Sequence, residues 1–183
     1  TFLVNGKAPA TGSVFLQKRL AATLRQIAKK GTDDYYRGEL AEQIAKELKQ
    51  IGSPLRIDDL HRHQAKLIDP LHLAHTVADV YNMTPPTQGV VSLMILGILD
   101  QLNLKQFAVD SPEYVHHCVE ATKQAFKVRD QYVTDPAYMQ KHAQEFLSPA
   151  FLKNLASKVD AQKALPWGAG RGPADTIWMG VID

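Results

Sequence analysis

Residues 90–102 read VVSLMILGILDQL and are apolar almost all round. A helix with apolar side chains on every face is typical of an element buried inside a protein core. The preceding residues 84–89 read TPPTQG, and their consecutive prolines force an extended turn that ends any ladder of hydrogen bonds. We therefore expect residues 90–102 to form the central helix of the core, with the other elements packed around it.

Two amphipathic helices are predicted upstream of this segment. The first begins at Ser13, whose hydroxyl can cap the first turn, and ends at Gly31. The second follows Thr32 and ends before Gly52. Their apolar stripes are Leu16, Leu20, Leu24 and Ile27 in the first helix, and Tyr36, Leu40, Ile44 and Leu48 in the second. Between Leu67 and Met83 the apolar spacing becomes even, which predicts short strands.

Two further helices are predicted downstream, each opened by a serine followed by proline. Ser111 precedes Pro112 and Ser148 precedes Pro149, a pattern typical of an N-cap and first helical position. The first of these helices is long, and its apolar stripe lies on the face shared by Val115, Cys118, Val119, Thr122, Phe126 and Arg129. The single cysteine, Cys118, is thus predicted to be a small core residue.

Bulk composition excludes several classes of protein. The 183 residues have a formal net charge of +2 with no basic run, so a nucleic-acid partner is not expected. One cysteine excludes an internal disulfide framework. No apolar run approaches the roughly 20 residues of a membrane span, and residues 1–12 lack the pattern of a signal peptide. The cellular compartment stays open.

The last part of the chain has a different composition. Residues 165–175 read LPWGAGRGPAD, whose glycines and prolines are typical of a flexible connector. Residues 176–183 read TIWMGVID, which favours a strand. The expected organisation is a helical part at 1–159, a linker at 160–175 and a terminal strand at 176–183. Such a strand must pair with an earlier part of this chain or with another polypeptide.

Five segments, in order, resemble the gamma-glutamyltranspeptidase family of N-terminal-nucleophile hydrolases. The first is a helical segment, residues 20–48, with the family's core at Gly31, Tyr35, Tyr36, Gly38, Glu39 and Ala41. The others are MTPPTQG at 83–89, YVHHCVEATKQAFKVRDQYVTDP at 114–136, LSPAFLKNLASKVD at 147–160 and TIWMGVID at 176–183. The match that they mark out extends over nearly the whole chain, from residue 20 to residue 183.

The resemblance implies a fold and a nucleophile. The fold class is mainly α with a few short β-strands, as a fragment of the αββα sandwich of an N-terminal-nucleophile hydrolase. Residues 1–159 would belong to the large subunit and residues 176–183 would form the first strand of the small subunit. Autocatalytic cleavage between Asp175 and Thr176 would make Thr176 the new N-terminus, nucleophile and, through its α-amino group, catalytic base.

The chemistry fits a threonine at such a terminus. Its hydroxyl needs a base, and an α-amino group with a pKa of about 8 suits that task near neutral pH. The implied reaction is acyl transfer from gamma-glutamyl, glutathione-like amides to water or an amine through an acyl-threonine. No cofactor or metal is expected. The implied partners are the remainder of both subunits and a small gamma-glutamyl or acyl amide, and the fragment alone would be inactive.

Two departures from the family pattern favour alternatives. Ile177 follows the predicted nucleophile where typical transpeptidases have a second threonine, and Thr87 and Gln88 replace a serine pair. Both features are similar to the acylase-related branch, so a cephalosporin or glutaryl acylase-like amidohydrolase is one alternative. A non-catalytic helical scaffold is the other.

Other candidate residues have commoner structural roles. The seven histidines lack the cysteine or carboxylate partners of a zinc site, so surface or capping roles are expected. The GAGRG stretch at 168–172 lacks the preceding strand and the lysine of a phosphate-binding loop. Glu120, Arg129 and Asp135 match family positions, but a structural ion pair on one helix is the expected role of such residues.

Overall fold

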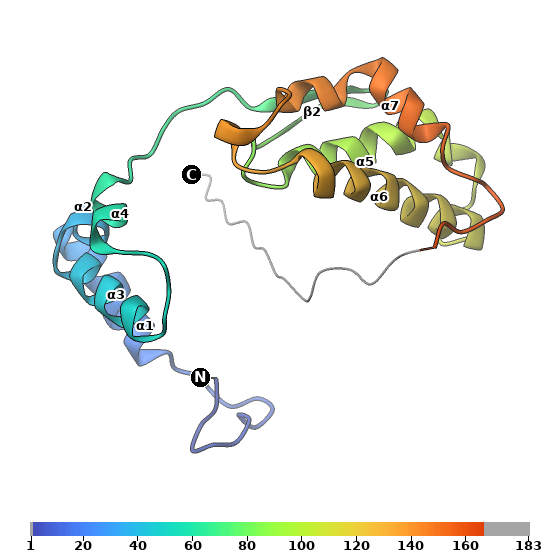
Figure 1. The fold of residues 1–183 in the computed structure, drawn as a ribbon. Coiled ribbons are helices and arrows are strands. Elements are labelled where there is room, and N and C mark those ends of the chain that lie inside the picture. Colours follow the sequence, from blue (N-terminus) through green and yellow to red (C-terminus); the bar gives the residue numbers. More distant parts are fainter. Residues whose placement is uncertain (1, 167–183) are drawn as a thin grey trace. The chain divides into compact units, whose positions relative to one another are not determined.

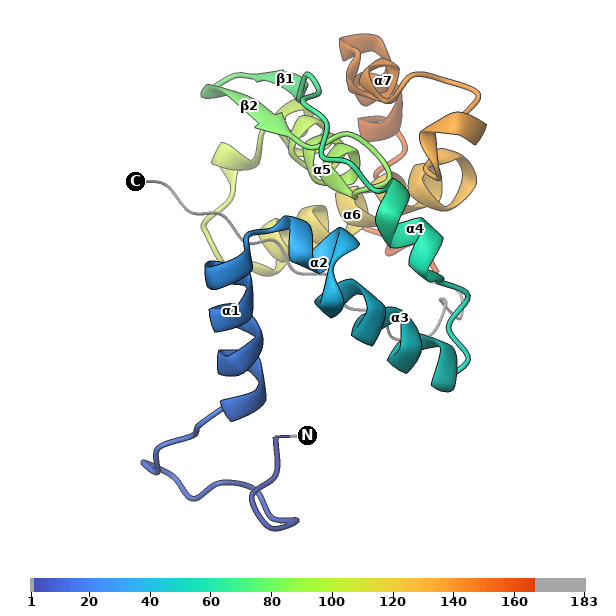
Figure 2. The ribbon, with the colours of Figure 1, turned by 90° about the vertical axis from the view of Figure 1, so that its left-hand side faces the viewer.

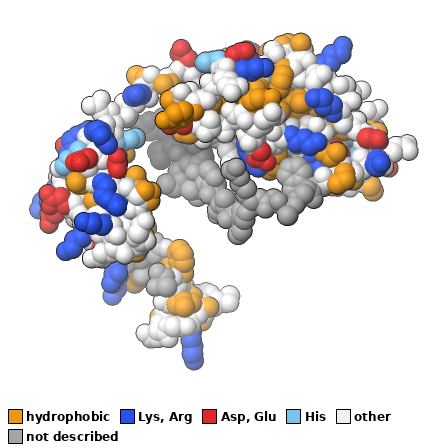
Figure 3. All heavy atoms as spheres, viewed as in Figure 1, with side chains coloured by type: hydrophobic (Ala, Val, Ile, Leu, Met, Phe, Trp, Pro, Cys, Tyr) orange, Lys and Arg blue, Asp and Glu red, His pale blue; other side chains and the backbone are white. Residues whose placement is uncertain are grey.

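The structure is a computed structural model that describes residues 2–166. The chain divides into two compact units at Leu67 and Ile68, each described here by itself. Figure 1 labels the elements of both units along the chain. The visible face of each unit carries acidic and basic side chains interspersed with one another (Figure 3).

Within residues 2–67, the first unit contains four helices. They are α1 (Lys18–Lys30), α2 (Asp33–Arg37), α3 (Glu39–Gln50) and α4 (Ile57–Arg62). The predicted start of the first helix at Ser13 was wrong. The Ser13 hydroxyl donates instead to the carbonyl of Ala10, 2.6 Å away, and Phe15 packs against Phe2, so residues 13–17 lie outside the helix. Of the predicted apolar stripe, Leu16, Leu20 and Leu24 are at least half exposed.

The predicted second helix is two helices, because Gly38 interrupts it. Gly38 is extended, with φ −105° and ψ −161°, and a Cβ atom there would overlap with the side chain of Asp34. Asp34 is buried and accepts a hydrogen bond from Gln26 Nε2 on α1 at 2.8 Å. The apolar residues of the predicted second helix thus keep helical spacing, but the backbone leaves the helix at Gly38.

The second unit packs around α5 (Gly89–Gln101), as predicted. A two-stranded antiparallel sheet, β1 (Leu71–His75) and β2 (Ala78–Asn82), and α7 (Pro149–Ala156) contact α5, and so does α6 (Pro112–Tyr132). Figures 1 and 2 show α5 between the hairpin and α7 on one side and α6 on the other. Up to residue 166, three short 3-10 helices, η1 (Leu104–Gln106), η2 (Pro136–Tyr138) and η3 (Ala143–Leu147), lie in the connections.

The core of this unit confirms the reading of residues 90–102 as a buried helix. Along the hairpin Leu71 pairs with Asn82 and Leu73 with Val80, and both leucines are buried. The buried apolar residues are Leu71, Leu73, Val90, Val91, Leu93, Met94, Ile98, Ala121, Ala125, Val128, Ala143, Phe146, Leu147, Leu152, Leu155 and Ala156. The described part of the chain is therefore mainly α with one short hairpin, as the sequence predicts.

The two serine–proline signals mark helix starts correctly. Ser111 lies at the N-cap of α6 and its hydroxyl accepts a hydrogen bond from Tyr114 N at 3.2 Å. Ser148 occupies the N-cap of α7 with extended backbone, although its side chain makes no capping bond. In both helices Pro supplies the first position, where its missing N–H leaves no intrahelical bond unmade.

Candidate functional site

The predicted nucleophile lies outside the described residues. Thr176 and the cleavage partner Asp175 belong to residues 167–183, as does the predicted strand at 176–183. The described chain ends at Pro166, ten residues before Thr176. The candidate site on the described part of the chain is therefore the approach to Thr176, residues 160–166, and the helix that holds it.

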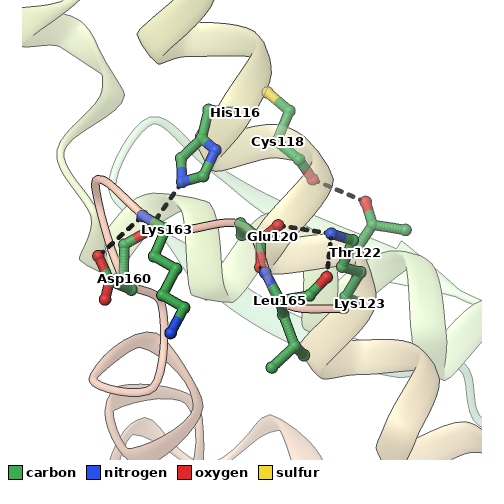
Figure 4. A network of polar contacts seen from close by, with 8 residues as sticks. All are labelled: His116, Cys118, Glu120, Thr122, Lys123, Asp160, Lys163 and Leu165. Atoms are coloured by element: carbon green, nitrogen blue, oxygen red, sulfur yellow. Dashed lines mark hydrogen bonds and ion pairs between the residues drawn. The ribbon is translucent and has the colours of Figure 1, made fainter. Parts of the chain in front are cut away.

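Leu165 is held to α6 through both of its backbone groups (Figure 4). Its N–H donates to Glu120 Oε2 at 3.2 Å, and its carbonyl accepts from Lys123 Nζ at 2.7 Å. Lys123 Nζ also donates to Glu120 Oε1 at 2.6 Å, which closes the arrangement. We call the three residues Glu120, Lys123 and Leu165 the clamp. Glu120 and Lys123 are three positions apart, which places them on neighbouring turns of one helical face.

The clamp is buried. The Glu120 side chain is 2% exposed and that of Lys123 is 14% exposed. Removing a carboxylate from water costs several kcal/mol unless another charge and hydrogen bonds replace the water. Here Lys123 supplies the charge, and the two oxygens of Glu120 each accept a hydrogen bond.

Electrostatics keep Glu120 ionised. Burial raises the pKa of its carboxyl, but the hydrogen bonds from Lys123 and Leu165, with the charges of Lys123 and His116, outweigh burial and lower the pKa below its ordinary value. A carboxylate with a lowered pKa and both oxygens occupied is poorly suited to proton transfer at neutral pH. Its geometry suits the holding of a backbone segment instead.

A second attachment lies a few residues upstream. His116 Nε2 lies 2.8 Å from the carbonyl of Asp160, which can only accept, so this nitrogen carries the hydrogen (Figure 4). Asp160 Oδ1 accepts from the N–H groups of Gln162 and Lys163 at 2.8 and 3.0 Å, forming a tight turn. These backbone bonds lower the pKa of the Asp160 carboxyl. The first residues of the predicted linker, 160–166, are thus attached to α6 at two points.

The predicted core position of Cys118 on α6 was wrong. Val115 and Val119 are 48% and 46% exposed, and Cys118 is only partly buried, so it is not a core residue. The side chains of this face line a shallow apolar hollow: Tyr114, Val115, Cys118, Val119, Thr122, Lys123 and Phe126. The opposite face is the buried one, because its alanines Ala121 and Ala125 allow α5 to approach closely.

The family-like residues on α6 do not form the predicted ion pair. Glu120 bonds Lys123, whereas Arg129 Nε bonds the neighbouring Asp130 at 2.8 Å and its guanidinium lies 3.8 Å from the centre of the Phe126 ring. Asp135 accepts from Ala137 N and begins η2. Sequence reasoning missed the contacts that join Lys123 and Leu165 to Glu120. The one available signal was the spacing of Glu120 and Lys123.

The turn before α5 is held by hydrogen bonds that involve its own backbone groups. Its Pro85–Pro86 peptide bond is cis. Thr87 Oγ1 lies within hydrogen-bond distance of the carbonyls of Met83 and Thr84, and Gly89 N donates to the same oxygen at 3.3 Å. Gly89 must lack a side chain, since a Cβ there would overlap with the carbonyl oxygen of Met83. The turn therefore fixes the start of the central helix.

Histidines occupy structural positions in the described part of the chain. His63 stacks on Tyr36, His72 bonds Asp79 at 2.6 Å, and His75 lies 3.6 Å from Asp100. Among residues 2–166, no group of three or more histidine, cysteine or carboxylate side chains could hold a metal ion. Nor is any helix in that range long and apolar enough to cross a bilayer.

Comparison with known proteins places the site in context. A sequence profile of the family described as Gamma-glutamyltranspeptidase matches residues 1–183. The oxamate amidohydrolase proenzyme of Klebsiella pneumoniae is 47% identical over the whole chain, which covers 34% of that relative. The glutathione hydrolase proenzyme of Escherichia coli is 31% identical over 90% of the chain and 29% of the relative. The chain spans about a third of the length of these curated relatives.

Solved structures have the same fold. The gamma-glutamyltranspeptidase from Pseudomonas nitroreducens complexed with L-DON superposes with a TM-score of 0.71 at 30% identity, over 85% of this chain and 47% of that chain. The cephalosporin acylase from Bacillus halodurans gives a TM-score of 0.69 at 30% identity, over 85% of this chain and 29% of that one. The described elements therefore form part of a larger fold that these proteins share.

Proposed function

The chain belongs to the gamma-glutamyltranspeptidase family, and from this premise we propose that its parent protein is a self-processing enzyme with Thr176 as nucleophile. The observation that carries the proposal is the extent of the family match. It runs to residue 183 and so includes the Asp175–Thr176 bond. The attachment of Leu165 to α6, ten residues before Asp175, supports it, because the segment that leads to this bond starts from a defined place.

Processing would proceed by an acyl shift within the chain. The hydroxyl of Thr176 attacks the carbonyl carbon of Asp175, the bond from that carbon to the Thr176 nitrogen breaks, and an ester forms. Water then cleaves the ester, which releases the Asp175 carboxylate and a free Thr176 with both its hydroxyl and its α-amino group. The amine is the base that the hydroxyl lacked before cleavage.

Turnover would use the same two groups on an external amide. The α-amino group accepts the hydroxyl proton as the Thr176 oxygen attacks the substrate carbonyl, and the proton passes to the leaving amine or ammonia. The resulting acyl-threonine is then cleaved by water or by an acceptor amine. Residues in the rest of both subunits would bind the substrate and stabilise the oxyanion, so we expect the 183-residue chain alone to be inactive.

Two acyl donors are proposed. Gamma-glutamyl amides are the first, since several relatives are glutathione hydrolase proenzymes. A small amide of the oxamate type is the second, because the relative that is 47% identical across the whole chain is an oxamate amidohydrolase proenzyme. Ile177, in place of the second threonine of typical transpeptidases, favours hydrolysis over transfer for either donor.

Assays of the full-length parent protein test the proposal. Purified parent is incubated with a gamma-glutamyl p-nitroanilide, read as p-nitroaniline, and with oxamate, read as ammonia, each with and without an acceptor dipeptide. We expect turnover of one donor, little gain from the acceptor, and loss of activity in Thr176→Ala. Turnover that survives Thr176→Ala, or its absence with both donors and with a broader panel of acyl amides, would contradict the proposal. In the second case a non-catalytic scaffold would account for the fold.

A further inference from the structure

The segment before the processing site is held through its backbone. Both polar backbone groups of Leu165 bond to side chains of α6, and the carbonyl of Asp160 bonds to His116 (Figure 4). Because these bonds go to backbone atoms, they fix the path of the segment independently of its side chains. A buried ion pair by itself adds little stability over apolar residues of similar volume, but this pair also satisfies the two backbone groups of Leu165, which apolar side chains could not do.

We propose that Glu120 and Lys123 are positioning residues for self-cleavage: by holding Leu165 they fix the point from which residues 166–175 lead to the Asp175–Thr176 bond. This inference rests on the proposed function. Neither side chain takes part in the bond changes. Their role is to limit where the scissile carbonyl can lie relative to the helical unit.

The length of chain between Leu165 and Asp175 determines how much the clamp should change the rate of self-cleavage. Ten residues separate Leu165 from Asp175, a reach of at most about 35 Å when extended. Without the clamp, the nearest upstream attachment to α6 is the carbonyl of Asp160, bonded to His116 and fifteen residues from Asp175, with a reach of about 50 Å. The effective concentration of a tethered group falls roughly as the −3/2 power of tether length, which gives about a twofold loss. Lost orientation adds to this, since a displacement of 1 Å at a reacting centre can cost about 100-fold.

Four variants of the full-length parent separate positioning from general stability. Glu120→Gln keeps the size but replaces one accepting oxygen by an amide NH₂, so the side chain can no longer accept from both Lys123 and Leu165. Lys123→Met removes both bonds of that side chain, and Lys123→Arg keeps its charge and donors. The matched control is Gln144→Leu, which removes two bonds to the backbone of His72 in the same unit and does not touch residues 160–166.

Self-cleavage is followed after a pulse of cell-free synthesis, with denaturing electrophoresis at intervals and the thermal midpoint of each variant measured in a Thr176→Ala background. We expect Glu120→Gln and Lys123→Met to cleave about 10-fold more slowly than wild type. Lys123→Arg should restore most of the rate. Gln144→Leu should lower the thermal midpoint at least as much as Glu120→Gln while it cleaves within about twofold of wild type. Once cleaved, each clamp variant should turn over substrate at the wild-type rate per cleaved molecule, because Leu165 and Thr176 are then no longer joined by the chain.

The outcomes distinguish this inference from the proposed function. If the wild type cleaves between Asp175 and Thr176 and the clamp variants do so within a factor of about 1.5, the clamp has no positioning role and the proposed function stands. Slowing by Gln144→Leu equal to that of Glu120→Gln also overturns the inference, since loss of stability would then explain both. If the wild type itself is not cleaved at this bond, the proposed function fails and the inference fails with it.

Discussion

The side-chain amide of Gln144 bonds both backbone groups of His72, seventy-two residues earlier in the chain. Its Nε2 donates to the carbonyl of His72 at 2.7 Å, and its Oε1 accepts from the N–H at 3.0 Å. The amide thereby occupies both backbone groups of His72 on β1 and joins the hairpin to η3. One side chain replaces the two bonds that a third strand would make at this residue.

Gln144→Leu should therefore destabilise the second unit. It leaves two partly buried backbone groups without partners, and we expect a loss of about 2 kcal/mol in the free energy of unfolding. Urea unfolding of the parent protein in a Thr176→Ala background measures it. Gln106→Leu is the control, because the Gln106 amide makes one bond of 3.4 Å at an exposed site and its loss should cost less than about 0.5 kcal/mol. Equal effects of the two substitutions would contradict the role of Gln144.

Gly89→Ala should be more harmful than Gly97→Ala, although both glycines are buried in α5. A methyl group at Gly89 would overlap with backbone atoms of Met83, which cannot move without disturbing the turn. At Gly97 the nearest atoms are the side-chain ends of Leu152 and Leu73, which can shift, and alanine gains about 1 kcal/mol in helix propensity. We expect a loss of at least about 2 kcal/mol at Gly89 and a smaller loss, or none, at Gly97. The urea midpoints of the two variants test this prediction. A lower midpoint for Gly97→Ala than for Gly89→Ala would contradict it.

Gly38→Ala should disrupt the junction of α2 and α3. The added Cβ would overlap with the side chain of Asp34, which is held from α1 by Gln26. We expect a loss of about 1–3 kcal/mol confined to the first unit. Hydrogen exchange read by mass spectrometry should show faster exchange in peptides covering residues 18–50 and unchanged exchange in those covering α5. Unchanged exchange in both regions would show that the junction tolerates a side chain.

Acid should weaken the clamp. The pKa of Glu120 is lower in the folded protein than in the unfolded chain, so its ionised form stabilises the fold above the unfolded value of about 4.3, and this contribution is lost as the pH falls through the lower folded value. The stability difference between wild type and Glu120→Gln should be constant from about pH 6 to pH 8 and shrink below about pH 4. Urea unfolding across this range tests the sign. A difference that grows in acid would contradict a lowered pKa.

Much of the second unit could be predicted because its signals are local. The all-round apolarity of residues 90–102 and the Ser111–Pro112 pair depend only on neighbouring residues, and both elements form as expected. The orientation of α6 could not be predicted in this way. Its larger apolar residues, such as Val115 and Val119, face outward, whereas Ala121 and Ala125 face inward, because small side chains let two helices approach. Size and hydrophobicity pointed to the wrong face.

The candidate site, too, has one part that the sequence predicts and another that it does not. Family-like motifs in a fixed order identify the family and predict Thr176 as the nucleophile, which stays a prediction because it lies outside the described residues. The bond from Lys123 to Leu165 joins residues forty-two positions apart and depends on how the chain returns to α6 after α7. No local pattern around Leu165 indicates that its backbone is held. Contacts of this kind depend on tertiary packing, so they appear only in the structure.

The measurement that tests the central claim most directly is the intact mass of the full-length parent protein, wild type beside Thr176→Ala, after incubation at neutral pH. The account predicts two products from the wild type, an N-terminal fragment that ends at Asp175 and a C-terminal fragment that begins at Thr176. The Thr176→Ala variant should stay whole. Two intact proteins, or a wild type cut at another bond, would contradict Thr176 as the nucleophile.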